Sequence, residues 1–179
     1  MAKEKIIGLR RKKVRLLSYN SAWKKLYEKE EKILRSVIGE HVLDIQHIGS
    51  TSIPGAKSKP IIDIAIGVKT LKDGEKCIKP LEKLGCEYKH DAGIKGRHFF
   101  AKGREKSRTH YIHIVKLNGK LWKNFILFRD YLRKHKRAVK EYNELKEELS
   151  KKYKDDRDTY TAKKDTFIKE IIKKAELWL

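Results

Sequence analysis

The run Ile61–Val68 is the sequence feature that most constrains the fold, because it is nearly continuous isoleucine interrupted by one acid, Asp63. Such a run is typical of a strand that is covered on both faces. Side chains alternate along a strand, so Asp63 shares a face with Ala65, while Ile64 and its neighbours at every second position face the other way. A lone carboxylate there costs free energy unless it meets a partner. We therefore expect a central strand whose acid is either paired or functional.

A turn of small residues, His47 to Gly55, comes shortly before this strand. Gly49 lacks the Cβ that would keep a ligand away from the backbone, and Ser50 and Thr51 add hydroxyl groups. Lys59 supplies a cation between the turn and the strand. These residues predict contact with a phosphate or another anion, and the alternative is an ordinary connection between two strands.

Periodicity and capping signals place the remaining elements. Short strands alternate with helices at first and give way to helices alone, which indicates an α+β or mixed domain with a helical C-terminal part. We expect one domain over residues 1–179, with the sheet in about 1–118 and the helical part in about 119–179. The expected helices start at Asn20 or Ser21 (to about Val37), at Asp73 or Gly74 (to Leu84) and at about Lys120 (to the end), and the strands are Val42–Ile48, Cys86–Lys89, Arg97–Lys102 and Thr109–Lys116.

The formal net charge of +21 predicts attraction to polyanions such as nucleic acid and nucleotides. The alternative is a surface solvated by Lys and Glu, as in thermophiles, and the presence of a single glutamine, Gln46, agrees with it. A basic arm, Arg10 to Lys13, is either solvated or a local phosphate contact. No apolar run of membrane-spanning length and no leader sequence are found, so we expect a cytoplasmic protein without a membrane partner.

Two arginines border the apolar stripe of the first C-terminal helix. Arg129 lies four residues after Phe125, and Arg133 lies one turn further on. An inward arginine serves either as an ion-pair partner, here of Glu30 or Asp130, or as a fork that clamps an anion. Both interpretations stay open for this pair.

Three further polar residues are candidates for the site. Lys164 lies four residues after Tyr160 on an apolar stripe, so it either extends its ammonium group to solvent or contacts a phosphate or Asp63. His47 and His113 are either hydrogen-bonded residues beside the site or groups that transfer protons or bind metal.

The segment His47-Ile-Gly-Ser-Thr-Ser-Ile-Pro-Gly55 with Lys59-Pro-Ile-Ile-Asp63 resembles the GrpB family, which is also found fused to some bacterial dephospho-CoA kinases. The resemblance covers nearly the whole chain. Its other blocks are Tyr19 with Trp23, Tyr27 and Glu30; Arg97 with Phe99 and Phe100; Thr109 to His113; Phe128 to Arg133; Ala138 with Tyr142, Leu145 and Lys146; and Tyr160 with Lys164, Phe167 and Ile168.

The resemblance implies the polymerase-β-like nucleotidyltransferase superfamily, and with it an α+β fold that has a mixed β-sheet and helices packed on it. In that superfamily a Gly-Ser turn faces the triphosphate. Acids spaced two residues apart, with a third on a later strand, hold two divalent metals there. This sequence has Asp63 but carries Ala65 two residues later, and Thr109 to Lys116 contains no acid. Nitrogen ligands from His47 and His113 would favour Zn²⁺, Mn²⁺ or Ni²⁺ over Mg²⁺.

The sequence therefore predicts a nucleotidyltransferase-like protein that binds a nucleotide or a phosphorylated small molecule in a basic cleft. Transfer of a nucleotidyl group with Mg²⁺ or Mn²⁺ is the enzymatic form of this prediction, and its activity is left open because the carboxylate set is incomplete. The alternatives are a non-catalytic nucleotide or phosphate binder and an RNA- or DNA-binding protein; the oligomeric state is not predicted. The expected catalytic residues are Asp63 and His113, the expected phosphate ligands are Gly49, Ser50, Thr51, Lys59, Arg129, Arg133 and Lys164, and the candidate metal ligands are Asp63, His47 and His113.

One local expectation concerns Lys136, which stands where the family usually has a proline. Proline inside a helix removes a backbone donor and breaks the helix. Its replacement by lysine predicts one continuous helix through this point.

Overall fold

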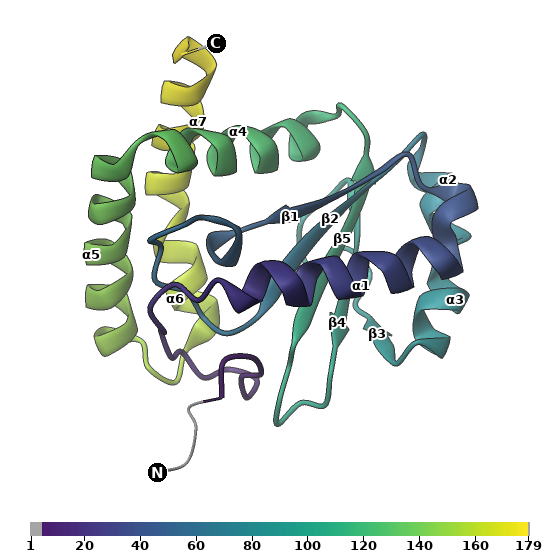
Figure 1. The fold of residues 1–179 in the computed structure, drawn as a ribbon, viewed down its shortest axis with the longest axis horizontal. Coiled ribbons are helices and arrows are strands. Elements are labelled where there is room, and N and C mark those ends of the chain that lie inside the picture. Colours follow the sequence, from purple (N-terminus) through teal and green to yellow (C-terminus); the bar gives the residue numbers. More distant parts are fainter. Residues whose placement is uncertain (1–4, 179) are drawn as a thin grey trace.

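The computed structural model describes residues 5–178, which form a five-stranded mixed sheet with helices packed on it (Figure 1). The strand order is β1-β2-β5-β4-β3, with β2 parallel to β5 and the other neighbouring pairs antiparallel. The predicted α+β class with a mixed sheet is confirmed. The strands are β1 (Asp44–Ile48), β2 (Ile62–Val68), β3 (Cys86–Tyr88), β4 (Arg97–Lys102) and β5 (His110–Lys116).

The register of β2 and β5 assigns the polar side chains to one face of the sheet. Asp63 pairs with Tyr111, and Ala65 pairs with His113. These four residues define what we call the Asp63 face. Alternation sends Ile64 and its neighbours at every second position to the opposite side, which we call the α1 face.

The α1 face carries the main hydrophobic core. Helix α1 (Ala22–Ile38) packs Trp23, Leu34 and Ile38 against the isoleucines of β2 and β5, and these three side chains are fully buried. The Asn20 side chain accepts a hydrogen bond from the backbone N–H of Ala22 at 2.9 Å, which satisfies one of the free donors at the start of the helix. The predicted helix and its cap are confirmed.

The helix expected from Asp73 or Gly74 to Leu84 is wrong in its continuity. The structure has two short helices, α2 (Leu71–Glu75) and α3 (Ile78–Lys83). Pro80 explains the break, because it has no N–H to continue a helix from α2 but is tolerated in the first turn of a new one. The chain therefore starts again at Ile78.

The Asp63 face is covered in part by α4 (Lys120–Lys134). Trp122 of this helix packs on Ile48, Ala65 and Val115, so β2 is buried on both faces, as its isoleucine run predicts. The helices α5 (Lys136–Lys152), α6 (Arg157–Lys163) and α7 (Asp165–Trp178) follow. Leu179, to which the helical prediction extends, lies outside the described residues.

A second core joins the helical part to the turn after β1. That turn is a single 3₁₀ turn, η2 (Ser50–Ser52), and Ile53 directly after it is fully buried against Leu132, Tyr142 and Ile171. The helical part therefore holds the small-residue turn in place from behind. Figure 1 shows α5, α6 and α7 gathered on one side of the sheet and α2 and α3 on the other.

The continuous helix expected at Lys136 is wrong. Helix α4 ends at Lys134, and α5 begins at Lys136 after His135, whose φ of −121° and ψ of 84° are not helical. The His135 ring stacks on Tyr131 at 3.8 Å, and its Nδ1 lies 2.7 Å from the Tyr131 carbonyl oxygen. These contacts fix the bend without a proline, and the bend turns α5 toward the second core.

The N-terminal arm crosses between the sheet and the helical part. Leu9 exchanges two backbone hydrogen bonds with Arg108, both of 2.9 Å, and Val14 donates to the Lys154 carbonyl oxygen at 2.8 Å. The arm is therefore tied to the loop before β5 on one side and to the segment before α6 on the other.

The longest helices, α1 and α5, have 17 residues each. Across residues 5–178, no helix combines the length and the apolar character needed to cross a membrane. The absence of a membrane partner and the cytoplasmic location both stay predictions.

Candidate functional site

Gly49 and Asp63 are pressed against each other at the start of the predicted turn. Gly49 adopts a φ of +67°, a conformation that side chains other than glycine rarely take. A Cβ at this position would lie 2.8 Å from Asp63 Oδ2. Glycine is therefore required for two independent reasons, and its absence of a side chain is what lets the turn approach the acid.

Asp63 is held by a chain of two hydrogen bonds on the Asp63 face. Arg97 Nη1 lies 3.1 Å from His113 Nδ1, and His113 Nε2 lies 3.4 Å from Asp63 Oδ1. Arginine only donates, so Nδ1 accepts and the proton of a neutral ring is on Nε2, which donates to Asp63. Burial lowers the pKa of His113, against the opposing effect of Asp63, so the neutral ring predominates at pH 7. His113 thus orients Asp63 without adding charge.

Ser50 meets a buried lysine from the helical part. Lys146 of α5 is 1% exposed, and its Nζ donates to Ser50 Oγ at 3.3 Å and to the carbonyl oxygen of Lys57. The ammonium group also lies 4.0 Å from the centroid of the Tyr142 ring. Burial first, and then the nearby positive charges, lower the pKa of Lys146 well below its usual value.

Two more lysines lie near Lys146, and both approach the ring of Tyr160. The Nζ of Lys164 lies 4.6 Å and that of Lys59 5.5 Å from the centroid of this buried ring. Burial, with the charges of Lys164 and Arg157, lowers the pKa of Lys59 to about 7. We call Lys59, Lys146 and Lys164 the lysine cluster.

The lysine cluster is short of negative charge. Among residues 5–178, no carboxylate forms an ion pair with any of its three ammonium groups, although Asp63 acts on Lys59 at longer range. The tyrosine rings provide some compensation through their negative faces. Lys146 is buried, and Lys59 and Lys164 are partly exposed. A buried cation such as Lys146 without an anionic partner is unfavourable unless a ligand supplies the anion. The arrangement therefore suits a ligand with several negative charges.

Two predicted residues face away from Asp63. Ile48 pairs with Asp63 across β1 and β2, so the preceding residue, His47, lies on the α1 face. There the His47 ring stacks on Tyr27 at 4.7 Å, and its Nε2 lies 2.9 Å from Thr51 Oγ1. Burial lowers the pKa of His47 to about 4, which keeps the ring neutral. The structure does not bring His47 and Thr51 together with Asp63.

Arg129 and Arg133 hold the backbone near the site. Arg129 Nε donates to Asp130 at 2.7 Å, and its Nη1 donates to the Gln46 side chain at 2.7 Å and to the His47 carbonyl oxygen at 3.2 Å. Arg133 Nε donates to the Ser52 carbonyl oxygen at 3.0 Å. Of the alternatives, the ion pair with Asp130 is confirmed, while anion contact stays a prediction for both arginines. The expected pairing with Glu30 is wrong, because Glu30 pairs with Lys102 on the other face of the sheet.

The donors around Asp63 do not fit a resident metal. No group of three or more His, Cys, Asp or Glu within the described part of the chain could hold an ion. In the tautomer that Arg97 selects, His113 directs a proton toward Asp63 and has no lone pair to offer there. One carboxylate is a poor holder of Mg²⁺ unless substrate phosphates and water complete the shell.

Sequence reasoning missed Lys146 and Arg97 as members of the site. Lys146 follows Tyr142 by four residues on an apolar stripe, which is the same spacing that singled out Lys164 after Tyr160. The signal was therefore present. Arg97 gave no such signal, because nothing in an exposed turn and short strand indicates contact with a histidine on another strand.

The fold places the protein in a known structural class. Its residues superpose on Cid1, a poly(U) polymerase whose structures hold a UTP analogue and MgGTP, with TM-scores of 0.51 and 0.52 and 15–16% identity. The match covers 75% of this chain and 42–44% of Cid1. At this identity the likeness concerns the fold alone, which is nucleotidyltransferase-like, as the resemblance implies.

The chain belongs to the GrpB protein family, whose model matches residues 13–174. It is 40% identical over 171 residues to the glutamate-rich protein GrpB of Alkalihalophilus pseudofirmus, a match that covers 93% of this chain and 98% of that protein. A crystal structure of GrpB from Enterococcus faecalis superposes with a TM-score of 0.84 at 34% identity, covering 92% and 100% of the two chains. A dephospho-CoA kinase of Mycolicibacterium paratuberculosis is 24% identical, and the match spans 46% of its length.

Proposed function

We propose that this protein binds the polyphosphate group of a nucleotide between Ser50 and the lysine cluster, beside Asp63. The observation that carries the proposal is the convergence of three lysines, Lys146 at the Ser50 hydroxyl and Lys59 and Lys164 at the Tyr160 ring, with no carboxylate ion pair among residues 5–178. A triphosphate carries enough negative charge to compensate the cluster. Charge-assisted hydrogen bonds to phosphate oxygens are also stronger than those between neutral groups.

The lowered pKa values of Lys59 and Lys146 support the same proposal. Both are lowered because burial and neighbouring cations disfavour the charged form. A bound phosphate would offset the cost of burial and the repulsion between the cations, since it adds an opposite charge and hydrogen-bond acceptors. Ligand binding would therefore relieve strain that the free protein carries.

Any Mg²⁺ or Mn²⁺ would bind together with the nucleotide and not to the free protein. Asp63 can offer one carboxylate oxygen to an ion that nucleotide phosphates already hold, which is the usual manner of Mg²⁺ binding at phosphate sites. Such an ion would neutralise phosphate charge at the acid. The bound nucleotide is then a prerequisite for the metal.

A binding experiment with a matched control tests the proposal. Calorimetric titration of the protein with ATP, GTP, CTP and UTP, with and without Mg²⁺, should detect binding that Lys164→Met weakens at least tenfold. Lys163→Met is the control, because Lys163 is the exposed preceding residue at the end of α6. No binding of any triphosphate, or equal losses in both variants, would overturn the proposal.

Nucleotidyl transfer is a second candidate, favoured by the position of Asp63 against the Gly49 turn and by the fold. An acceptor oxygen would form a bond to the α-phosphorus while the bond from that phosphorus to the bridging oxygen breaks. Pyrophosphate would leave, and the acceptor proton would pass to the Asp63 carboxylate. The reaction needs no oxidant or reductant.

Label transfer separates the second candidate from simple binding. The protein is incubated with an α-labelled triphosphate, Mn²⁺ and a mixture of acceptors, and Asp63→Asn is compared with the parent. Transfer that disappears in the variant, while triphosphate binding persists, supports catalysis by Asp63. Transfer that persists in the variant argues against this role, and binding without transfer favours the non-catalytic form.

A further inference from the structure

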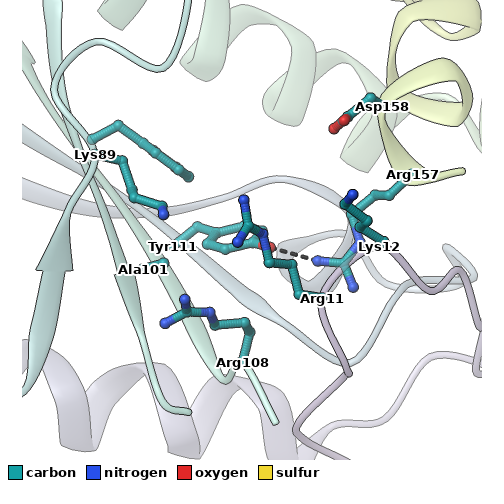
Figure 2. A pocket seen from close by; sticks show the side chains of 9 residues that line it. Arg11, Lys12, Lys89, Ala101, Arg108, Tyr111, Arg157 and Asp158 are labelled. Carbon is teal, nitrogen blue, oxygen red and sulfur yellow. Dashed lines mark hydrogen bonds between the residues drawn. The ribbon is translucent and has the colours of Figure 1, made fainter. Parts of the chain in front are cut away.

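A second basic region lies on the same face of the sheet, outside the lysine cluster. It is a pocket of about 160 Å³ whose floor consists of Phe99, Ala101 and Tyr111, from β4 and β5. Five cations line it (Figure 2): Arg11 and Lys12 from the N-terminal arm, Lys89 after β3, Arg108 before β5 and Arg157 from α6. We call it the arginine pocket.

The cations of the arginine pocket outnumber the acids attached to it. Arg11 pairs with Glu105 at 2.7 Å, whereas Lys89 and Arg108 share one acid, Glu87. Asp158 is a third carboxylate at the rim. Five positive charges thus face three negative ones, which leaves an excess of two. The pocket would repel a cationic ligand and attract an anionic one.

Arg157 shows that the pocket is built and is not a chance gathering of surface chains. Its buried guanidinium donates to the Tyr111 hydroxyl at 2.5 Å, to the Arg10 carbonyl oxygen at 2.6 Å and to the Lys13 carbonyl oxygen at 2.8 and 3.0 Å. It thereby fixes the arm against the sheet. Figure 2 shows the Arg11 and Lys89 side chains extending toward Tyr111. Each already has a carboxylate partner, so an anion in the pocket would compete with Glu105 and Glu87 or use the remaining donors.

The size and the position of the pocket indicate what it would hold. Sites for drug-sized ligands have about 300–1,000 Å³, so this volume suits a single phosphate group better than a whole nucleotide. Asp63, Tyr111 and Ala101 are register partners on β2, β5 and β4. Adjacent strands lie about 4.8 Å apart, so the pocket begins within about 10 Å of Asp63 along this row.

We propose that the arginine pocket binds the phosphate group of a second ligand, a small phosphorylated molecule whose hydroxyl-bearing end extends along the row toward Asp63. The role of this molecule as the acceptor of a nucleotidyl group rests on the proposed function. Phosphate binding in the pocket does not. A polynucleotide fits less well, because the arm and α6 flank the pocket and leave a local depression, not a continuous basic track.

Titration with ribose 5-phosphate tests the proposal in a protein whose other anion site is weakened. In the Lys164→Met background, ribose 5-phosphate should bind, and Arg11→Gln or Lys89→Met should weaken it about fivefold or more. Arg104→Gln is the matched control, because Arg104 is exposed near the pocket but does not line it. Triphosphate affinity in the otherwise unchanged protein should be the same with and without Arg11→Gln.

The outcomes distinguish this proposal from the preceding one. Ribose 5-phosphate binding that depends on Arg11 and Lys89 supports the pocket even if no triphosphate binds. Absence of binding, or a loss that Arg104→Gln reproduces, overturns it. A short RNA that binds through Arg11 with a steep salt dependence, while ribose 5-phosphate does not bind, would also overturn it and assign the pocket to nucleic acid.

Discussion

Two groups of charged side chains, each with a buried member, lie on opposite faces of the same sheet. On the α1 face, Glu30 is 5% exposed and accepts hydrogen bonds from Lys102 Nζ at 2.6 and 2.9 Å. On the Asp63 face, the lysine cluster has no such partner within residues 5–178. A buried charge with a partner completes the fold, whereas a buried charge without one leaves the structure ready for a ligand. The difference separates structural from functional cations in a chain where both are common.

The largest effect is expected from breaking the compensated pair. Glu30→Ala should lower the free energy of unfolding by about 3 kcal/mol, because Lys102 is left largely buried without its anion. Urea denaturation measures the change. The double variant Glu30→Ala with Lys102→Met should recover at least half of the loss, and a single-variant loss below about 1 kcal/mol would contradict the comparison.

On the Asp63 face, removing a charge is expected to raise the free energy of unfolding. Lys59→Met should raise the free energy of unfolding of the ligand-free protein by about 1 kcal/mol at pH 7.5, a figure already reduced for partial solvent screening. The gain arises because the variant removes a cation that burial and Lys164 disfavour. Triphosphate affinity should fall at least tenfold in the same variant. A loss of stability comparable to that of Glu30→Ala would show that Lys59 is a structural cation.

The pH dependence of binding sharpens the comparison further. The pKa of Lys59 is lowered to about 7, so the free protein loses this proton as the pH rises through 7. A bound phosphate favours the charged form and raises the pKa, so binding takes up a proton above pH 7. Affinity for a triphosphate should therefore fall on the order of tenfold between pH 7.5 and 9.

Calorimetry in two buffers of different ionisation enthalpy measures this proton uptake. Lys59→Met should flatten the profile, which excludes titration of the nucleotide as the cause. The stability of the free protein changes in the opposite direction for the same reason. The unfolded chain holds the Lys59 proton up to about pH 10.5, so this lysine makes the free energy of unfolding rise with pH above 7. An affinity that rises from pH 7.5 to 9 would contradict the assignment.

The elements of the fold follow from local signals in the sequence. The apolar run of β2, the period of α1 and the alternation of β5 each reflect one face or two faces being buried, and each was predictable from its own residues. The residues at which helices end were less predictable. His135 ends α4 by stacking on Tyr131, and this contact depends on how the helical part packs.

The candidate site was predictable in its residues more than in its arrangement. Gly49 and Ser50 directly follow β1 and Asp63 lies at the start of β2, so antiparallel pairing of these two predicted strands brings Gly49 to Asp63. The lysine cluster unites a loop with α5 and the turn between α6 and α7, and the packing of Ile53 and Tyr142 in the second core positions α5 against the loop. Periodicity shows that a lysine faces inward but not which other lysine it meets.

The smallest effect is expected at an exposed ion pair, and it tests whether overall charge could replace the lysine cluster in explaining anion binding. Glu141 pairs with Arg137 at 3.2 Å, and their side chains are 45% and 93% exposed. Glu141→Gln should change the free energy of unfolding by less than about 0.5 kcal/mol, because solvent screens such pairs.

The same variant raises the formal net charge from +21 to +22, since one acid is removed. If general attraction to a basic surface caused nucleotide binding, affinity would rise in this variant and fall steeply with salt. If the lysine cluster causes it, affinity should stay within twofold of the parent while Lys164→Met loses at least tenfold. Titration of both variants at low and moderate salt decides between long-range charge and a local site.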